Sequence, residues 1–131
     1  KVRSALESIE KQTADGKVLT LILALNYSSR SEITRAVQQI ARRVAAGEFA
    51  PEAITEQTLS ESLDTAPWPD PDLIVRTSGE QRLSNFLLWQ ASYAELWFPE
   101  VLWPDFTERD FDRALEEYAR RDRRFGLVKD K

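Results

Sequence analysis

The stretch DLIVRTSGEQRLSNF, from Asp72 to Phe86, joins a short apolar run to a glycine-containing turn and a second apolar segment. It predicts a buried strand over residues 73–76, a turn at Gly79, and a helix over residues 84–91 that is capped by Ser84. Such a unit presents the free N–H groups and positive dipole end of a helix beside the carboxyl end of a strand. The stretch therefore predicts an α/β protein with an anion-binding site at this turn.

Two arginines strengthen the prediction of an anion site. Arg76 falls at the exit of the predicted strand, and Arg82 falls in the loop before Ser84. Planar guanidinium groups bind the oxygens of a diphosphate bidentately, so diphosphate is the expected ligand. A solvated surface position is the usual alternative for any single loop arginine. Two arginines beside a capping serine and a glycine favour the anion site instead.

Strands and helices alternate outward from this stretch. The pattern predicts helices over residues 1–13, 29–46, 55–63 and from Thr107 onward, and further strands over residues 18–25 and 95–98. Residues 18–25 (VLTLILAL) are apolar almost throughout, as in a strand buried on both faces of a parallel sheet. We expect a single domain over residues 1–131, with a mainly parallel sheet flanked by helices and one edge of the sheet left open.

The composition excludes several kinds of chemistry. The chain has 131 residues, a net charge of −4, no cysteine and no histidine, so disulfides, thiolate chemistry and histidine bases are absent. The acidic balance argues against general nucleic-acid binding. No apolar run approaches 18 residues, so no transmembrane segment is expected. Any metal must have oxygen ligands, which favours Mg²⁺.

The longer stretch DLIVRTSGEQRLSNFLLWQASYAELWFPEVLWPDF, from Asp72 to Phe106, closely resembles the C-terminal signature of the cis-prenyltransferases, the undecaprenyl diphosphate synthase family. LILALNYSSRSEI, from Leu21 to Ile33, is similar to a second block of that family, and Arg124-Phe125-Gly126 resembles its RxG tail. The resemblance implies a homodimeric, Mg²⁺-dependent α/β enzyme. Such an enzyme condenses isopentenyl diphosphate in cis onto an allylic diphosphate such as farnesyl diphosphate. The resemblance also implies a cytoplasmic enzyme of bacterial wall-lipid synthesis, whose product is released to the membrane.

The resemblance also assigns roles to individual residues. It implies that Arg76, Arg82 and Ser84 bind isopentenyl diphosphate and that Glu95 ligates Mg²⁺. It implies that Arg124 and Gly126 reach toward a phosphate site across the dimer. It assigns no catalytic residue in this chain. The residues alone leave open a surface role for Glu95 and a solvated helix end for the arginine-rich tail.

The chain departs from the family pattern at three places. Ser28 and Ser29 replace two glycines, so we expect a reshaped loop if those positions need positive φ. Gln81 stands where some relatives carry histidine, and it is not expected to bind metal. The N-terminal block that supplies the family's essential aspartate is absent. We therefore expect the C-terminal part of a longer protein, with the N-terminal strands of the fold missing, that is inactive in isolation.

Two other functions remain as alternatives. One is a non-catalytic diphosphate-binding or dimerisation fragment, or an accessory subunit of the same superfamily. The other is an unrelated phosphate-binding α/β enzyme. A cluster of aromatic residues is expected to form core or a dimer surface: Trp89, Tyr93, Trp97, Phe98 and Trp103.

Overall fold

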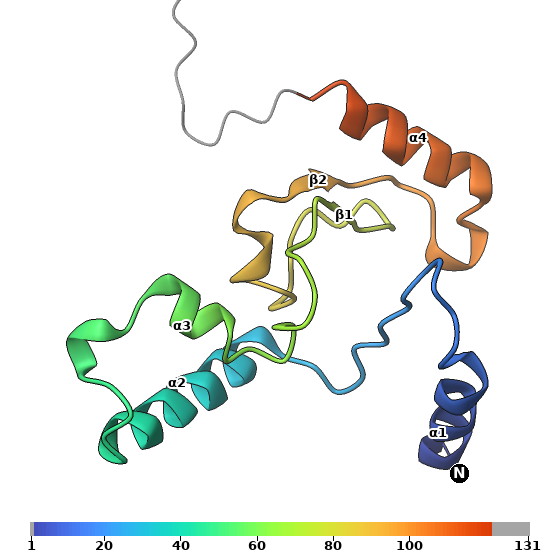
Figure 1. Ribbon diagram of the computed structural model, residues 1–131. Helices are drawn as coiled ribbons and strands as arrows, with labels where there is room; N and C mark the ends of the chain where they lie inside the picture. Colours follow the sequence, from blue (N-terminus) through green and yellow to red (C-terminus); the bar gives the residue numbers. More distant parts are fainter. Residues whose placement is uncertain (1, 122–131) are drawn as a thin grey trace, which may run out of the picture.

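A computed structural model describes residues 2–121 and shows a small parallel sheet with helices around it (Figure 1). The helices are α1 (Val2–Thr13), α2 (Ser29–Ala45), α3 (Glu56–Ser60) and α4 (Glu108–Ala119), and the strands are β1 (Leu73–Val75) and β2 (Glu95–Trp97). Three short 3₁₀ helices complete the described elements: η1 (Pro51–Ala53), η2 (Gln90–Tyr93) and η3 (Trp103–Asp105).

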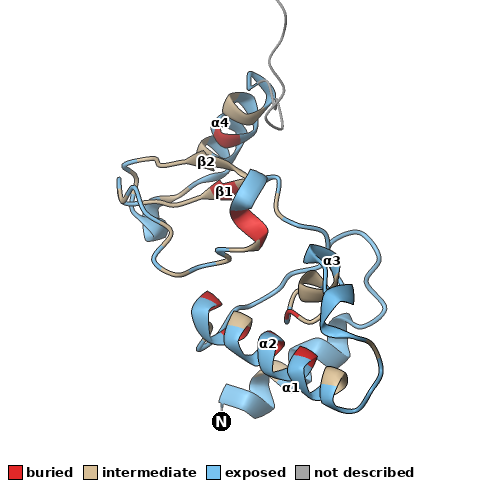
Figure 2. Ribbon diagram, turned by 90° about the vertical axis from the view of Figure 1, so that its left-hand side faces the viewer, coloured by how far each residue is buried: buried red, intermediate tan, exposed pale blue. Residues whose placement is uncertain are grey.

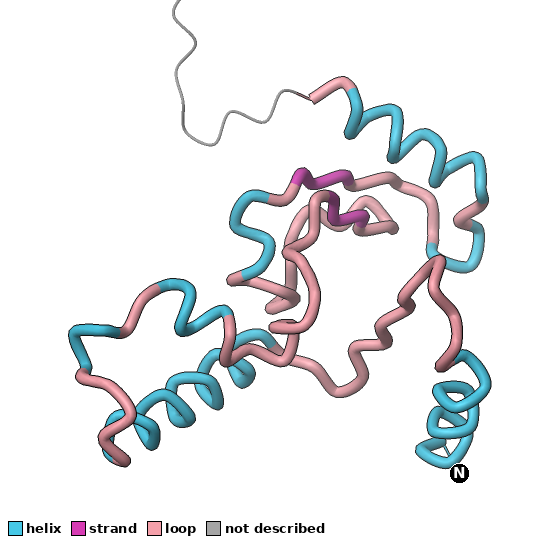
Figure 3. The backbone as a smooth tube through the Cα atoms, in the orientation of Figure 1, coloured by secondary structure: helices cyan, strands magenta, loops and turns pink. Residues whose placement is uncertain are grey.

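The two strands are parallel, with Ile74 paired with Leu96 at the centre of the ladder. Ile74 is buried, and α4 packs on β2 with its buried Ala114. The crossover from β1 to β2 passes through the turns of residues 76–89 and then η2 (Figure 3). The prediction of an α/β fold with a parallel sheet and flanking helices is confirmed.

Local sequence signals account for the helices. Thr55 and Thr107 occupy the N-cap positions of α3 and α4, and each helix has a capping box. Ala36 and Ile40 are buried on one face of α2, and Gly47 follows that helix with a φ of 77°. The helices predicted over residues 1–13, 29–46, 55–63 and from Thr107 onward are confirmed as α1, α2, α3 and α4. Helix α3 ends at Ser60, three residues before the expected end.

The predicted strand over residues 18–25 is wrong. This segment is an exposed loop that makes no ladder (Figures 2 and 3). Val18 is fully exposed and Leu19 is 83% exposed. A strand needs a neighbour for its backbone N–H and C=O groups, and residues 2–121 provide none beside this segment. The apolar pattern therefore gives an exposed loop without a third strand.

The predicted helix over residues 84–91 is also wrong. Ser84, Asn85 and Leu87 have φ values of 49°, 64° and 47°, whereas an α-helix needs φ near about −63°. Only η2 is helical in this region. Ser84 is thus not a helix N-cap, and no helix dipole from this segment acts on the predicted anion site.

Neither of the two serines that replace family glycines has a positive φ. Ser28 has an extended φ of −152° and is the N-cap residue of α2, and Ser29 is the first residue of that helix. Neither position needs positive φ, so serine fits both. Ser29 and Glu32 have the spacing of a capping box in the sequence, but the N-cap residue is Ser28. Glu32 does not close a capping box, because its side chain is buried elsewhere.

Candidate anion-binding site

The turn after β1 is held by backbone hydrogen bonds to the segment that follows β2. The N–H of Arg76 donates to the carbonyl of Trp97 at 2.9 Å, which extends the ladder by one residue. The N–H groups of Ser78 and Gly79 donate at 2.8 Å to the carbonyls of Val101 and Pro99. Gly79 has a φ of 66°, a conformation that suits glycine. These bonds tie the turn to the end of β2 and the segment after it, at the carboxyl end of the sheet.

A cavity of about 340 Å³, lined by both polar and apolar side chains, opens beside this turn. Arg76 lines it from the end of the strand and Arg82 lines it from the following loop, so the structure brings the two predicted arginines together. Glu80 also lines the cavity and forms an ion pair with Arg82. Two arginines against one glutamate leave the lining with a net positive charge, which suits an anion.

Ser84 and Glu95 lie outside this lining. Ser84 is exposed and lies two residues beyond Arg82 in the same loop. Glu95 begins β2 opposite Leu73, at the other end of the ladder from Arg76, and its carboxylate pairs with Arg121 at 2.7 Å. Arg124 and Gly126 lie outside the described residues.

The described residues could hold a metal ion only if the substrate supplies some of the ligands. Among residues 2–121, no group of three or more acidic side chains gathers closely enough to hold an ion. Mg²⁺ is commonly bound by one or two carboxylates together with substrate phosphates and water. The carboxylate of Glu95, whose side chain is 22% exposed, is a donor of the right kind.

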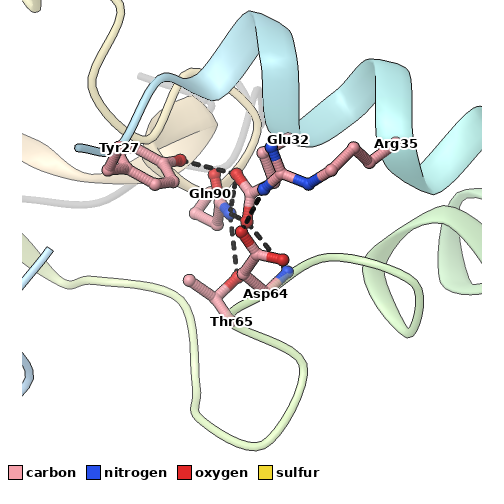
Figure 4. Close-up of polar contacts among 6 residues, drawn as sticks. All are labelled: Tyr27, Glu32, Arg35, Asp64, Thr65 and Gln90. Carbon is pink, nitrogen blue, oxygen red and sulfur yellow. Dashed lines mark hydrogen bonds and ion pairs between the residues drawn. The ribbon is translucent and has the colours of Figure 1, made fainter. Parts of the chain in front are cut away.

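The sequence did not reveal a buried carboxylate at the start of α2. Glu32 is only 1% exposed and accepts hydrogen bonds from the Tyr27 hydroxyl at 2.5 Å and the Asp64 N–H at 2.9 Å. The buried amide of Gln90 donates to the same carboxylate at 3.2 Å and to Thr65 at 2.8 Å (Figure 4). These bonds join the start of α2, the segment after α3, and η2.

Glu32 affects the ionisation of its neighbour Tyr27. Burial, and then the hydrogen bond to Glu32, raise the pKa of Tyr27 above its ordinary value of 10.0. Arg35 lies one turn further along α2 and pairs with Asp64 at 2.5 Å. The spacing of Glu32, Ala36 and Ile40 at intervals of four was the signal in the sequence, because it places Glu32 on the buried face of α2.

The chain is thus an α/β protein with a parallel sheet and an arginine-lined cavity at the carboxyl end of a strand, where α/β proteins commonly bind ligands. The sequence profile of the family described as "Putative undecaprenyl diphosphate synthase" matches residues 1–126. The chain belongs to this family.

Several curated relatives are isoprenyl transferases. That of Agrobacterium fabrum is 57% identical over 127 residues, which cover 97% of this chain and 51% of the relative. That of Geobacillus kaustophilus is 57% identical over 126 residues, which cover 96% of this chain and 49% of the relative. The chain therefore spans about half the length of the curated relatives it matches.

Solved structures show the same fold. Lavandulyl diphosphate synthase from Lavandula x intermedia, in complex with dimethylallyl diphosphate, matches with a TM-score of 0.90 and 39% identity. The match covers 95% of this chain and 54% of the lavender chain. A probable undecaprenyl diphosphate synthase from Campylobacter jejuni matches with a TM-score of 0.77 and 40% identity, over 96% of this chain and 56% of that one. Within residues 2–121, no helix has the length and apolar character needed to cross a bilayer.

Proposed function

We propose that this chain supplies the isopentenyl diphosphate site of a cis-prenyltransferase. That enzyme condenses isopentenyl diphosphate onto an allylic diphosphate, such as farnesyl diphosphate, to give a cis-polyprenyl diphosphate. The observation that carries the proposal is the cavity at the carboxyl end of β1, where Arg76 and Arg82 meet in a chain of this family.

Each site residue has a distinct task in this proposal. Arg76 and Arg82 bind the diphosphate oxygens, and Arg82 exchanges its ion pair with Glu80 for the substrate. Ser84 donates its hydroxyl hydrogen to the same diphosphate. Holding the diphosphate fixes the position of the isopentenyl double bond relative to the allylic carbon, which lowers the entropic cost of reaction. The dimethylallyl diphosphate bound to the lavender relative supports an allylic diphosphate as the second substrate.

We further propose Glu95 as a ligand of Mg²⁺. When bound, the ion would neutralise charge that develops on a departing diphosphate. For this role Glu95 must release Arg121, so Mg²⁺ and Arg121 compete for one carboxylate. Glu95→Gln should raise the Mg²⁺ concentration needed for half-maximal activity, and an unchanged Mg²⁺ requirement would remove Glu95 from the site.

The remaining parts of the proposal concern the whole protein. It acts as a cytoplasmic homodimer and releases its product to the membrane, and Arg124 and Gly126 contact a phosphate across the dimer. The 131 residues alone bind isopentenyl diphosphate without turning it over. Radiolabelled isopentenyl diphosphate, farnesyl diphosphate and Mg²⁺ should give polyprenyl products with the protein as its gene encodes it, and their absence would contradict the enzyme assignment.

A second candidate is a non-catalytic diphosphate-binding module or accessory subunit of the same superfamily. It is favoured by the lack of any acidic cluster among the described residues. This candidate predicts diphosphate binding without turnover in the protein that the gene encodes, so the same product assay separates it from the enzyme.

The direct test of the site is calorimetric titration of isopentenyl diphosphate with and without Mg²⁺. Arg76→Ala and Arg82→Ala should each weaken binding by at least about tenfold, since each removes charge-assisted hydrogen bonds. Arg42→Ala, which removes an exposed arginine from α2, is the matched control and should bind as the parent does. Equal loss in all three variants would indicate nonspecific charge attraction and contradict the site.

A further inference from the structure

We propose that Asn85 is a positioning residue that holds the loop of Arg82 and Ser84 against the first turn of α2. The inference rests on the proposed function, because it concerns the same diphosphate site. It adds a residue outside the cavity lining that acts on the substrate through its neighbours rather than by contact.

Asn85 makes three hydrogen bonds to the start of α2. Its side-chain oxygen accepts from the N–H of Arg30 at 2.9 Å, and its side-chain nitrogen donates to the hydroxyl of Ser28 at 2.7 Å. Its backbone carbonyl accepts from the N–H of Ser29 at 2.9 Å. Asn85 therefore satisfies two of the N–H groups that a helix leaves free at its N-terminus.

A fourth bond closes the contact on the far side of the loop. The N–H of Leu88 donates to the hydroxyl of Ser29 at 3.0 Å, and Ser29 is fully buried. The bonds from Asn85 and Leu88 thus hold the loop at both ends of residues 85–88. The segment is joined to residues more than 50 positions earlier in the chain.

The loop needs such support because its backbone is unfavourable by itself. Ser84, Asn85 and Leu87 all have left-handed φ values, a conformation that is unfavourable for residues other than glycine. Asparagine tolerates this conformation better than most residues, whereas leucine does not. Without the contacts to α2, the loop would relax, and the side chains of Ser84 and Arg82 would move with it.

Two substitutions test the role without adding strain. Asn85→Gly keeps the left-handed backbone accessible and removes both side-chain bonds, and Ser28→Ala removes only the partner of the Asn85 amide nitrogen. Thr55→Ala is the matched control, because it removes the N-cap of α3 and lowers stability, while Thr55 itself makes none of the bonds that hold the loop. All variants are made in the protein as its gene encodes it.

Steady-state kinetics with isopentenyl diphosphate and farnesyl diphosphate give the readout. The loss of two hydrogen bonds in Asn85→Gly should raise the KM for isopentenyl diphosphate by about tenfold, and the single loss in Ser28→Ala by about threefold. The KM for farnesyl diphosphate should stay unchanged in both variants. Thr55→Ala should lower the melting temperature and leave both KM values as they are.

Arg82→Ala separates failure of this inference from failure of the proposed function. If Arg82→Ala raises the KM for isopentenyl diphosphate while Asn85→Gly and Ser28→Ala behave like Thr55→Ala, the positioning role alone is overturned. If Arg82→Ala also leaves that KM unchanged, the site itself is wrong and the inference fails with it. If Asn85→Gly does not fold, the KM of Ser28→Ala for isopentenyl diphosphate is the test, and a value equal to that of Thr55→Ala overturns the positioning role.

Discussion

Replacement of Glu32 by glutamine should destabilise the protein more than replacement of any exposed glutamate. Glu32→Gln keeps the volume of the side chain but removes its charge and turns one acceptor oxygen into an NH₂ donor. The native carboxylate faces only donors: the Tyr27 hydroxyl, the Asp64 N–H and the Gln90 amide. At least one of these donors will therefore face the new NH₂ group.

The magnitude follows from the burial of these partners. Hydrogen bonds to charged groups contribute roughly 1.5–3 kcal/mol each, and an unpaired buried donor costs a similar amount. Tyr27 is half-buried and Asp64 is exposed, so water can partly replace their lost bonds. We expect Glu32→Gln to lower the free energy of unfolding by about 2–3 kcal/mol, and Glu32→Ala by about 4 kcal/mol.

Urea unfolding followed by circular dichroism measures these values. Glu52→Gln, at an exposed glutamate of η1, is the matched control and should change stability by no more than about 0.5 kcal/mol. If Glu32→Gln falls within the same range as Glu52→Gln, the buried cluster does not stabilise the fold and the reasoning is refuted.

Three further predictions concern other contacts. Hydrogen bonds from Thr107 lower the pKa of Asp110 below 3.8, so the stability that this carboxylate contributes is present above that pH and is lost as the pH falls through the lowered pKa. In Asp110→Asn the free energy of unfolding should therefore change less over this acidic range than in the parent. A dependence on pH equal to that of the parent would contradict the capping box. Tyr27 has a raised pKa, so its contribution to stability is complete below pH 10.0 and is lost as the pH rises through the folded-state pKa. Tyr27→Phe should therefore reduce the fall in melting temperature at alkaline pH. A fall as steep as that of the parent would argue against burial of this hydroxyl. Trp97→Ala removes a half-buried side chain from β2. It should lower the free energy of unfolding by about 2 kcal/mol, shift the mass measured by ultracentrifugation toward the monomer, or both. An unchanged free energy of unfolding together with an unchanged mass would refute a role in the core or at a dimer surface.

The sequence predicted the elements that depend on neighbouring residues. The capping threonines at positions 55 and 107 and the four-residue spacing of Ala36 and Ile40 correctly indicated α3, α4 and α2. The apolar runs that became β1 and β2 were also recognised, as were the two arginines that meet in the cavity. These features are readable because a cap, a helical face or a short apolar strand is defined within a few residues.

The sequence failed where distant contacts decide the conformation. Residues 18–25 have a strand pattern but no neighbouring strand among residues 2–121, so they stay exposed. Residues 84–91 have a capping serine and apolar spacing, yet hydrogen bonds from Asn85 and Leu88 to the start of α2 hold a left-handed loop instead of a helix. Tertiary contacts outweigh helix propensity here, because propensity differences are small beside several hydrogen bonds at a buried helix end.

The sequence alone determined the helices α1 to α4, the strands β1 and β2, the arginines available for an anion and the family resemblance. Only the tertiary structure decided that Arg76 and Arg82 share one cavity, that Ser84 and Glu95 lie outside it, and that Glu32 is buried among donors. The burial of Glu32 depends on bonds to residues 32 and 58 positions away, and the loop that carries Arg82 and Ser84 is tied to residues 55 and 59 positions away. Local preferences cannot specify them, because they arise only when the chain packs and its polar groups must find partners away from water.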